Sequence, residues 1–458
     1  ANFVGFQVGF MDSLPGQSDP TVQPAERLRS DTCRLSKGDF DYEKTCRPAD
    51  PPCRLPGREF RTSERQQHCG CRRKNEKIDT LEQLNETYTF DRTLDGKGCV
   101  YLPGLVDAHM HTGQQLLRGR VLDEMPMIWT RIMLPFESTL TPEKMRLSAQ
   151  LAALDMIQSG TAGFIDAGSY YMEEAAEVYR ESGLRGALSF STMDQKGLPA
   201  SIAMDADEAI RRTDALYDAF HGKGNLKVYY SLRSLISCSR ELMEAAGSRA
   251  RERGTMLQAH MNEYPGEINF FMEREQMRPY EYLEKLGILG EHFIGAHSLL
   301  LSEDEKQLLA KRGVNVCHCP FSNCGKAAPD TPSLMSKGIT VSLGTDGAAH
   351  GGLSLWNEMK IFRSVMNLHF GVPLSNPAVM PAKTILKMAT VNGQKCLGNP
   401  NGGVIREGAS ADLIGIDMQK PHLAIYGHLS NTLLESVNAS DVTDSIVGGR
   451  VLMEKGKS

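Results

Sequence analysis

Six side chains that could build a hydrolytic metal site recur along the chain, each just past a short apolar run. In a parallel α/β barrel the C-terminal ends of the strands meet on one face, so residues that are distant in sequence converge there. Imidazole and carboxylate groups are the donors that Zn²⁺ and Fe²⁺ take in proteins. The pattern therefore predicts a metal-dependent hydrolase, and its candidate residues are His109, His111, His260, Glu263, His297 and Asp346.

The metal ligands expected from this pattern are three histidines and one aspartate. His109 and His111 lie two residues apart, so in a strand both imidazoles point the same way and can face one ion. Among 12 histidines a His-x-His arises by chance about one time in three or four, so its place at a strand end is what matters. His260 ends a later strand. Asp346 precedes a glycine, as turn and N-cap aspartates often do, but neighbouring first and last barrel strands would bring it beside the histidine pair. We expect one divalent ion, Zn²⁺ or alternatively Fe²⁺, with water completing its shell.

Two further residues are candidates for catalysis. Glu263 follows His260 by three places, and a carboxylate that is close to a metal-bound water without being a ligand is suited to carry protons. A solvated loop glutamate is the alternative reading. His297 could bind the ion, but orienting the hydroxide and polarising the substrate is the simpler assignment. A second zinc site at Cys317, His318 and Cys319 is disfavoured, because buried cysteines are common in cores.

The elements that must position these residues alternate between strand and helix. Pro142–Ser159 is a predicted helix with Thr141 as its cap, a stop at Gly160, and Leu147, Leu151 and Leu154 on one face. Ser302-x-x-Glu305 is a capping box for another helix. Eight alternations over roughly 240 residues match a (β/α)8 TIM-type barrel, and an open doubly wound sheet is the alternative. The eight expected strands are Leu105–Ala108, Thr161–Ile165, Gly186–Phe190, Lys227–Tyr230, Thr255–Ala259, Phe293–Ala296, Val314–Cys317 and Ile339–Leu343.

Both ends of the chain differ from this barrel, which is expected over residues 104–395. Residues 77–103 and 396–458 are predicted to form one small β domain, a β-sandwich built from segments that flank the barrel. Its expected C-terminal strands are Gly402–Ile405, Ala411–Ile416, Asp444–Val447 and Val451–Met453. Residues 1–76 carry many arginines and prolines and five of the 11 cysteines. A disordered extension, a small cysteine module and a non-native reading frame all stay open for this segment.

Composition limits the class of protein. The 458 residues are 41% hydrophobic and 23% charged, with a net charge of −5, as in ordinary globular domains. No concentrated basic stretch is visible, which argues against a nucleic-acid partner. No apolar run reaches the roughly 18 residues that a membrane span requires. The first residues lack the basic start of a secretory signal, so a cytoplasmic location is expected. A homo-oligomer is compatible with a barrel of this size, although the sequence marks no interface.

Several stretches resemble the amidohydrolase superfamily, in its mononuclear aminohydrolase and chlorohydrolase branch, from about residue 77 to the end. The resemblance implies His109, His111, His260 and Asp346 as ligands, Glu263 as acid/base and His297 as the hydroxide partner. The matching stretches are Pro103–His111, His260–Glu263, Gly295–His297, Gly344–Ala348 and Glu407–Ile414.

Within that branch the chain looks most like S-adenosylhomocysteine and methylthioadenosine deaminases and their triazine-hydrolysing relatives. Trp129 and Glu137 lie where those deaminases carry a tryptophan and a sugar-binding glutamate. Two departures count against a nucleoside substrate: Phe190 lies near the place of an arginine in those deaminases, and Arg233 lies where they have a histidine after the fourth strand. Trp129, Glu137 and Arg233 are therefore the candidate substrate-binding residues, and the resemblance implies a small-molecule substrate that we expect to be a purine, pterin, triazine or adenosine derivative.

The predicted reaction is hydrolytic deamination of an amino-substituted heterocycle. The ion would lower the pKa of its water from near 16 to about 7, and Asp346 and His297 would direct the hydroxide to the ring carbon. Glu263 would protonate the ring nitrogen and then the departing amine, so that ammonia leaves. A chlorohydrolase or N-alkylamine hydrolase is the alternative on the same site. A non-catalytic scaffold is a third hypothesis, which the complete ligand set argues against.

Overall fold

The computed structural model describes residues 92–121, 123–124 and 128–458, together with residues 39–41, 74, 75, 78 and 84. The hypotheses for residues 1–76 therefore fall almost entirely outside the described residues.

Parallel strands form the centre of the fold. They make two five-stranded sheets, ordered β12-β11-β10-β9-β8 and β13-β4-β5-β6-β7, and every pairing within them is parallel. The strands are β4 (Leu105–His111), β5 (Thr161–Asp166), β6 (Arg185–Leu188), β7 (Leu226–Val228), β8 (Tyr230–Leu232), β9 (Leu257–Met261), β10 (Phe293–His297), β11 (Asn315–His318), β12 (Thr340–Leu343) and β13 (Asp346–Gly347).

The two sheets are joined at both of their edges, by the continuous chain between β7 and β8 and by a hydrogen bond after β12. Between β7 and β8, the Tyr229 amide donates to Leu188 in one sheet and the Tyr230 amide donates to Met256 before β9. Just after β12, the Thr345 amide donates to the carbonyl of His109 on β4. The predicted α/β class with parallel strands is confirmed. Each of the eight expected strands overlaps an observed one, with shifts of one to two residues at most ends.

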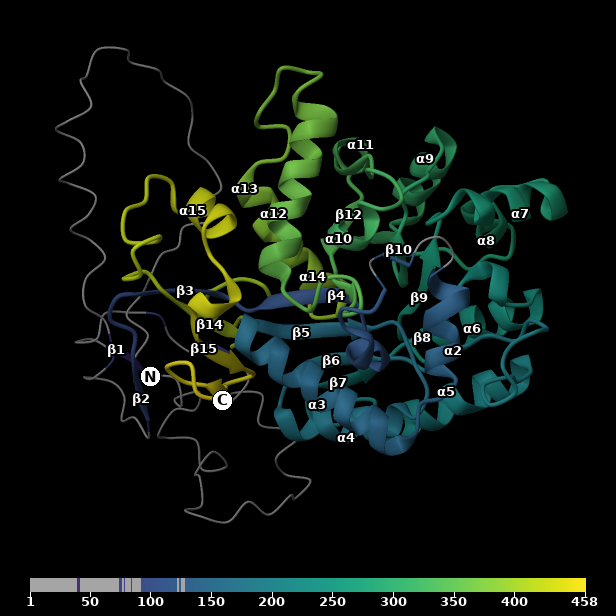
Figure 1. Cartoon of the computed structure of the whole chain (residues 1–458), viewed down its shortest axis with the longest axis horizontal. Coiled ribbons are helices and arrows are strands. Elements are labelled where there is room, and N and C mark those ends of the chain that lie inside the picture. Colours follow the sequence, from purple (N-terminus) through teal and green to yellow (C-terminus); the bar gives the residue numbers. More distant parts are fainter. Residues whose placement is uncertain are drawn as a thin grey trace.

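Helices flank the parallel strands, as Figure 1 shows. Helices follow β4, β5, β6, β8, β9, β10, β11 and β13, which is the alternation that the sequence predicted. They are α2 (Leu134–Glu137), α3 (Pro142–Ser159), α4 (Met172–Ser182), α5 (Ala206–Phe220), α6 (Arg240–Glu252), α7 (Pro265–Glu275), α8 (Pro279–Lys285), α9 (Glu303–Arg312), α10 (Pro320–Asn323), α11 (Thr331–Ser336), α12 (Leu355–Met366), α13 (Ala382–Lys387), α14 (Gly393–Cys396) and α15 (Leu429–Glu435).

Helix α3 has the predicted ends but not the predicted inner face. Its first turn is capped by the Thr141 side chain, and it stops at Gly160 with φ 81°. The leucine face, however, points outward, with Leu147, Leu151 and Leu154 exposed by 48%, 42% and 44%. The buried face is instead made largely of small residues and methionine, which allow the helix to approach the strands closely. Because both faces of α3 carry apolar residues, the sequence pattern does not show which face is buried, and the tertiary packing decides it.

A four-stranded antiparallel sheet joins segments from before and after the parallel strands, and it lies at one end of the molecule in Figure 1. The predicted pairing of the C-terminal region with the segment before the first barrel strand is confirmed, because β14 pairs with β3. The predicted strand at Gly402–Ile405 is wrong: Gly403 has φ 75° and packs against the backbone of Val391, so the chain turns there. The strands are β3 (Cys99–Pro103), β14 (Leu413–Asp417), β15 (Val442–Val447) and β16 (Arg450–Met453), and β1 (Asp39–Asp41) pairs separately with β2 (Thr93–Asp95).

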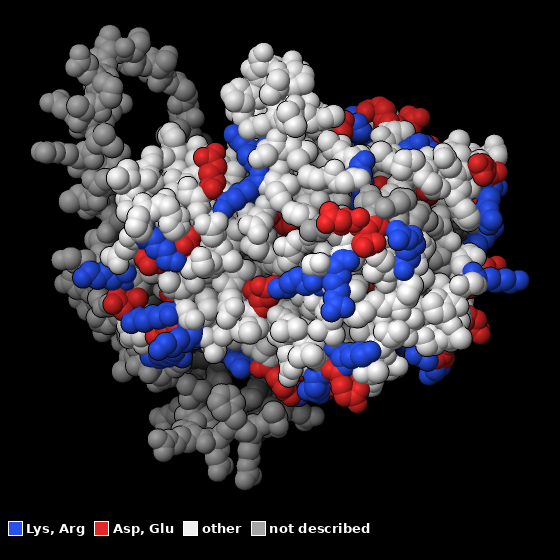
Figure 2. All heavy atoms as spheres, viewed as in Figure 1, with Lys and Arg blue, Asp and Glu red and all other residues white. Residues whose placement is uncertain are grey.

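On the face shown in Figure 2, acidic and basic side chains are interspersed over the described surface. None of the helices in the described ranges combines the length and the apolar character that crossing a bilayer requires.

Candidate active site

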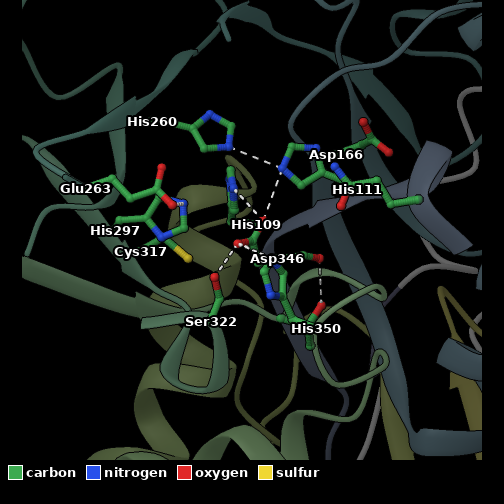
Figure 3. Close-up of polar contacts among 12 residues, drawn as sticks. His109, His111, Asp166, His260, Glu263, His297, Cys317, Ser322, Asp346 and His350 are labelled. Atoms are coloured by element: carbon green, nitrogen blue, oxygen red, sulfur yellow. Dashed lines mark hydrogen bonds and ion pairs between the residues drawn. The ribbon is translucent and has the colours of Figure 1, made fainter. Parts of the chain in front are cut away.

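Four of the predicted side chains meet at the C-terminal ends of β4 and β9 and at the start of β13 (Figure 3). The Nε2 atom of His111 lies 3.2 Å from Oδ1 of Asp346 and 3.2 Å from Nε2 of His260. The Nε2 atom of His109 lies 3.9 Å from the same Asp346 oxygen. One donor atom from each residue falls within 4.8 Å of the others. The arrangement places three imidazoles and one carboxylate around a single point. We refer to His109, His111, His260 and Asp346 as the four-donor group.

The local backbone explains why Asp346 reaches the histidines. A Cβ atom on Gly344 would lie 2.6 Å from the carbonyl oxygen of His109, so only glycine permits this close approach. Thr345 is fixed by the buried Asp107 carboxylate, which accepts from its amide at 3.0 Å and from its hydroxyl at 2.6 Å. Asp346 itself has φ 60°, an unfavourable conformation for a non-glycine residue and one that clusters at functional sites.

The protonation states suit a cation. Burial, together with the neighbouring imidazoles, holds the pKa values of His109 and His260 well below the usual range. Burial alone would raise the pKa of Asp346, but the hydrogen bond from His111 and the nearby His297 hold it well below its usual value. Both ring nitrogens of His109 are buried without a hydrogen-bond partner among the described residues. Neutral imidazoles with free lone pairs beside an ionised carboxylate fit a divalent metal ion.

Glu263 and His297 lie beside these four residues, and the His297 ring centroid is 5.3 Å from those of His109 and His260. Nε2 of His297 is 3.6 Å from Oε1 of Glu263, and these two residues with Asp346 form a second group whose donor atoms lie within 4.8 Å of one another. The Nδ1 atom of His297 is held 3.0 Å from the side-chain amide of Asn323. The predicted pair therefore lies next to the four-donor group, and it could itself compete for an ion.

Three residues that sequence reasoning missed complete this region. Ser322 donates to Oδ2 of Asp346 at 2.6 Å, and Nε2 of His350 lies 3.7 Å from the same oxygen. Lys326 forms an ion pair with Glu263 and donates to Ser322 at 2.7 Å. His350 could have been suspected, since it follows Asp346 by four residues. Ser322 lies in a four-residue helix and Lys326 follows it closely, and so short a helix gives no periodic signal in the sequence.

A cavity of about 490 Å³ opens onto these groups, within the size range of small-molecule sites. Its polar wall includes His111, His260, Glu263, Lys326 and Asp346. A large part of the remaining wall is apolar and comes from Ile128, Trp129, Met133, Ile236, Tyr264 and Pro265.

Of the three predicted substrate-binding residues, Trp129 and Arg233 line the cavity and Glu137 does not. Glu137 is 1% exposed and lies behind Arg233, whose guanidinium binds its Oε1 atom at 2.9 Å. Gln114 donates to the same oxygen at 2.9 Å. The guanidinium of Arg233 also lies 2.9 Å from Nδ1 of His111. Arg233 thus links a buried carboxylate to one of the converging imidazoles.

Comparison with known proteins agrees with this geometry. Residues 100–452 match the model of the amidohydrolase family. A 5-methylthioadenosine/S-adenosylhomocysteine deaminase from Thermococcus onnurineus is 35% identical over 386 residues, covering 83% of this chain and 88% of the relative. A 5'-deoxyadenosine deaminase from Methanosarcina mazei is 35% identical over 372 residues, covering 80% of this chain and 83% of the relative. The crystal structure of an adenosine deaminase from Xanthomonas campestris with bound zinc superposes with a TM-score of 0.78 at 24% identity, covering 84% of this chain and 87% of that one.

The chain belongs to the amidohydrolase family. It is a hydrolase that acts on carbon–nitrogen bonds other than peptide bonds.

Proposed function

We propose that the chain is a zinc-dependent deaminase of adenosine-type nucleosides. It would replace the exocyclic amino group of the purine with oxygen, consuming one water and releasing one ammonia. The observation that carries the proposal is the position of Glu263, which lies beside the four-donor group at the edge of a cavity of nucleoside size. The names of the relatives at 35% identity support the adenosine class of substrate.

His109, His111, His260 and Asp346 would hold the ion, with Fe²⁺ as the alternative to Zn²⁺. A bound divalent ion supplies a water ligand with a pKa of about 7 and hence a nucleophile at neutral pH. The free ring nitrogens of His109 and the low pKa values of His109 and His260 support this assignment.

Glu263 would move the protons. Its carboxylate takes a proton from the attacking water and delivers it to the ring nitrogen, which makes the neighbouring carbon electrophilic. It then takes the second proton of the attacking oxygen and delivers it to the amino group, so that the carbon–nitrogen bond breaks, ammonia leaves and the oxygen stays on the ring carbon. The buried Nε2 atom of His297 has no hydrogen-bond partner in the described part of the chain, and it would orient the oxygen that attacks.

The charges of the cavity favour nucleosides with an uncharged 5' substituent. Among the described lining residues, the lysine and the arginine are each held by a carboxylate: Lys326 by Glu263, and Arg233 by Glu137. No spare lysine or arginine of this wall would receive the carboxylate of an amino-acid substituent. Trp129 and Met133 offer an apolar surface for the base and for a methyl or methylthio group.

A substrate panel tests the proposal. The zinc-loaded protein is assayed for ammonia release from 5'-methylthioadenosine, 5'-deoxyadenosine, adenosine, S-adenosylhomocysteine, guanine, a pterin and an aminotriazine. We expect kcat/KM to be highest for the first two and at least about tenfold lower for S-adenosylhomocysteine, as one unpaired ionic group costs roughly 1.4 kcal/mol or more. Activity on no nucleoside would overturn the proposal. Chloride or alkylamine release from a substituted triazine would favour the chlorohydrolase or N-alkylamine hydrolase alternative.

We also infer that the two parallel sheets close into one (β/α)8 barrel over residues 104–395. The continuous chain between β7 and β8 and the hydrogen bond after β12 support closure. Residues 77–103 and 396–458 would form the small β-sandwich domain, and residues 1–76 an extension that contacts it at Lys74 and Asn75. A cytoplasmic location and a homo-oligomeric state stay predictions, and fractionation and light scattering would test them.

A further inference from the structure

Lys326 is a buried cation at the polar wall of the cavity. Its side chain is only 6% exposed, and a charge withdrawn from water to this degree requires charged or polar partners. It forms an ion pair with Oε1 of Glu263 and donates to the Ser322 hydroxyl at 2.7 Å. The ring centroid of Tyr264 lies 5.2 Å from the ammonium, a cation–π distance.

The ammonium group lies between two carboxylates that have different roles in the proposed function. Lys326 pairs directly with Glu263. Its ammonium is 4.0 Å from Oδ2 of Asp346, and Ser322 links the two by donating to this oxygen at 2.6 Å. Asp346 thus turns Oδ1 towards the histidines and Oδ2 towards Ser322 and Lys326.

Glu263 lies close enough to other donor atoms to become a metal ligand itself. Its carboxylate, His297 and Asp346 present donor atoms within 4.8 Å of one another, so a cation could recruit Glu263 as a ligand. A glutamate bound to the ion would lose the freedom to carry protons. The contact that holds Glu263 apart from the four-donor group would therefore be needed for catalysis.

We propose that Lys326 is a positioning residue that tethers Oε1 of Glu263 and so keeps this carboxylate free of the metal, with Oε2 left for proton transfer. The inference rests on the proposed function. It agrees with the contacts of Glu263, because Oε1 accepts from Lys326 and faces His297, while Oε2 has no hydrogen bond within the described part of the chain. Catalytic groups act only when they are held close to the productive geometry.

A double-mutant cycle tests the tether. We expect K326M to lower kcat by at least about 10²-fold, the contribution of a positioned acid/base group, while KM changes less than about threefold. If Lys326 acts through Glu263, adding K326M to E263Q should lower kcat by less than about threefold. The matched control is K337M, because Lys337 also pairs with a glutamate, Glu303 at 2.6 Å, but lies outside the cavity wall. This control should behave as the wild type does.

Cobalt substitution gives a readout that is independent of turnover. The d–d absorption of Co²⁺ weakens when its coordination number rises, so recruitment of Glu263 in K326M should weaken and shift the band relative to wild type. The band should stay unshifted in K326M/E263Q. K326R keeps the positive charge, so it should keep the wild-type band, and it serves as a second test if K326M does not fold. Thermal unfolding is measured for every variant.

The inference is overturned if K326M lowers kcat equally in the wild-type and E263Q backgrounds, or if the cobalt spectra of K326M and wild type coincide. A wild-type protein that releases no ammonia from any nucleoside would contradict the proposed function, and the cobalt spectra would still decide the role of Lys326.

Discussion

Replacing Arg233 with methionine should destabilise the protein strongly, because it leaves a carboxylate unpaired in the interior. The side chains of Arg233 and Glu137 are 3% and 1% exposed and meet at 2.9 Å. Removing one partner of such a buried pair costs about 3–5 kcal/mol, since the remaining charge cannot return to water. Oε2 of Glu137 already lacks a hydrogen-bond partner among the described residues, so Gln114 is the only other donor found at this carboxylate.

Two further variants separate the charge effect from lost packing. E137Q keeps an acceptor for Arg233, and we expect it to cost about 1–2 kcal/mol, as for a weakened buried hydrogen bond. R233M/E137L removes both charges and should recover at least about 2 kcal/mol relative to R233M. Urea unfolding of the metal-free proteins, followed by circular dichroism, measures these differences without the contribution of a bound ion. Single-variant costs below about 1 kcal/mol that simply add in the double variant would refute the reasoning about burial.

Three other predictions follow from single residues. E263Q should bind zinc as the wild type does, by mass spectrometric metal analysis, and lose at least about 10²-fold in kcat; near-normal turnover would reject its role. G344A should lose zinc, because its Cβ would lie 2.6 Å from the His109 carbonyl oxygen, whereas G427A, where a Cβ meets nothing within 4 Å, should keep it; equal zinc content in both would contradict the close approach. Burial raises the pKa of Glu267 to about 8 from 4.5, so its protonated form stabilises the folded state fully below pH 4.5 and this contribution is lost as the pH rises through 8. The free energy of unfolding of the wild type relative to E267Q should therefore fall over that window, by at most about 1.4 kcal/mol per pH unit, and parallel stability curves would exclude this titration.

The sequence was sufficient to predict the convergence of the four-donor group. His109 and His111 share a strand face by the period of two, and the alternation of strands and helices placed His260 and Asp346 at the same edge. Both patterns are local in the sequence, and the order of the parallel strands alone brings these residues together. The ends of α3 were predictable for the same reason, because Thr141 and Gly160 act within one turn.

What the sequence did not predict depends on contacts between distant segments. Lys326 comes from a loop with no period, and it meets Glu263 only because β9 and β11 flank β10 in the sheet. The pairing of Arg233 with Glu137 joins residues 96 positions apart, and neither residue carries a local sign of it. The outward leucine face of α3 was also beyond a periodicity argument, because the opposite face is apolar as well.

The proposed enzyme requires one metal ion bound by His109, His111, His260 and Asp346, with Glu263 left unbound. A crystal structure of the zinc-loaded protein, with anomalous data collected at the zinc edge, measures this directly. We expect a single anomalous peak about 2.0–2.2 Å from one nitrogen of each histidine and from one Asp346 oxygen. A peak bound by Glu263 and His297 instead, or no peak at stoichiometric zinc, would contradict it.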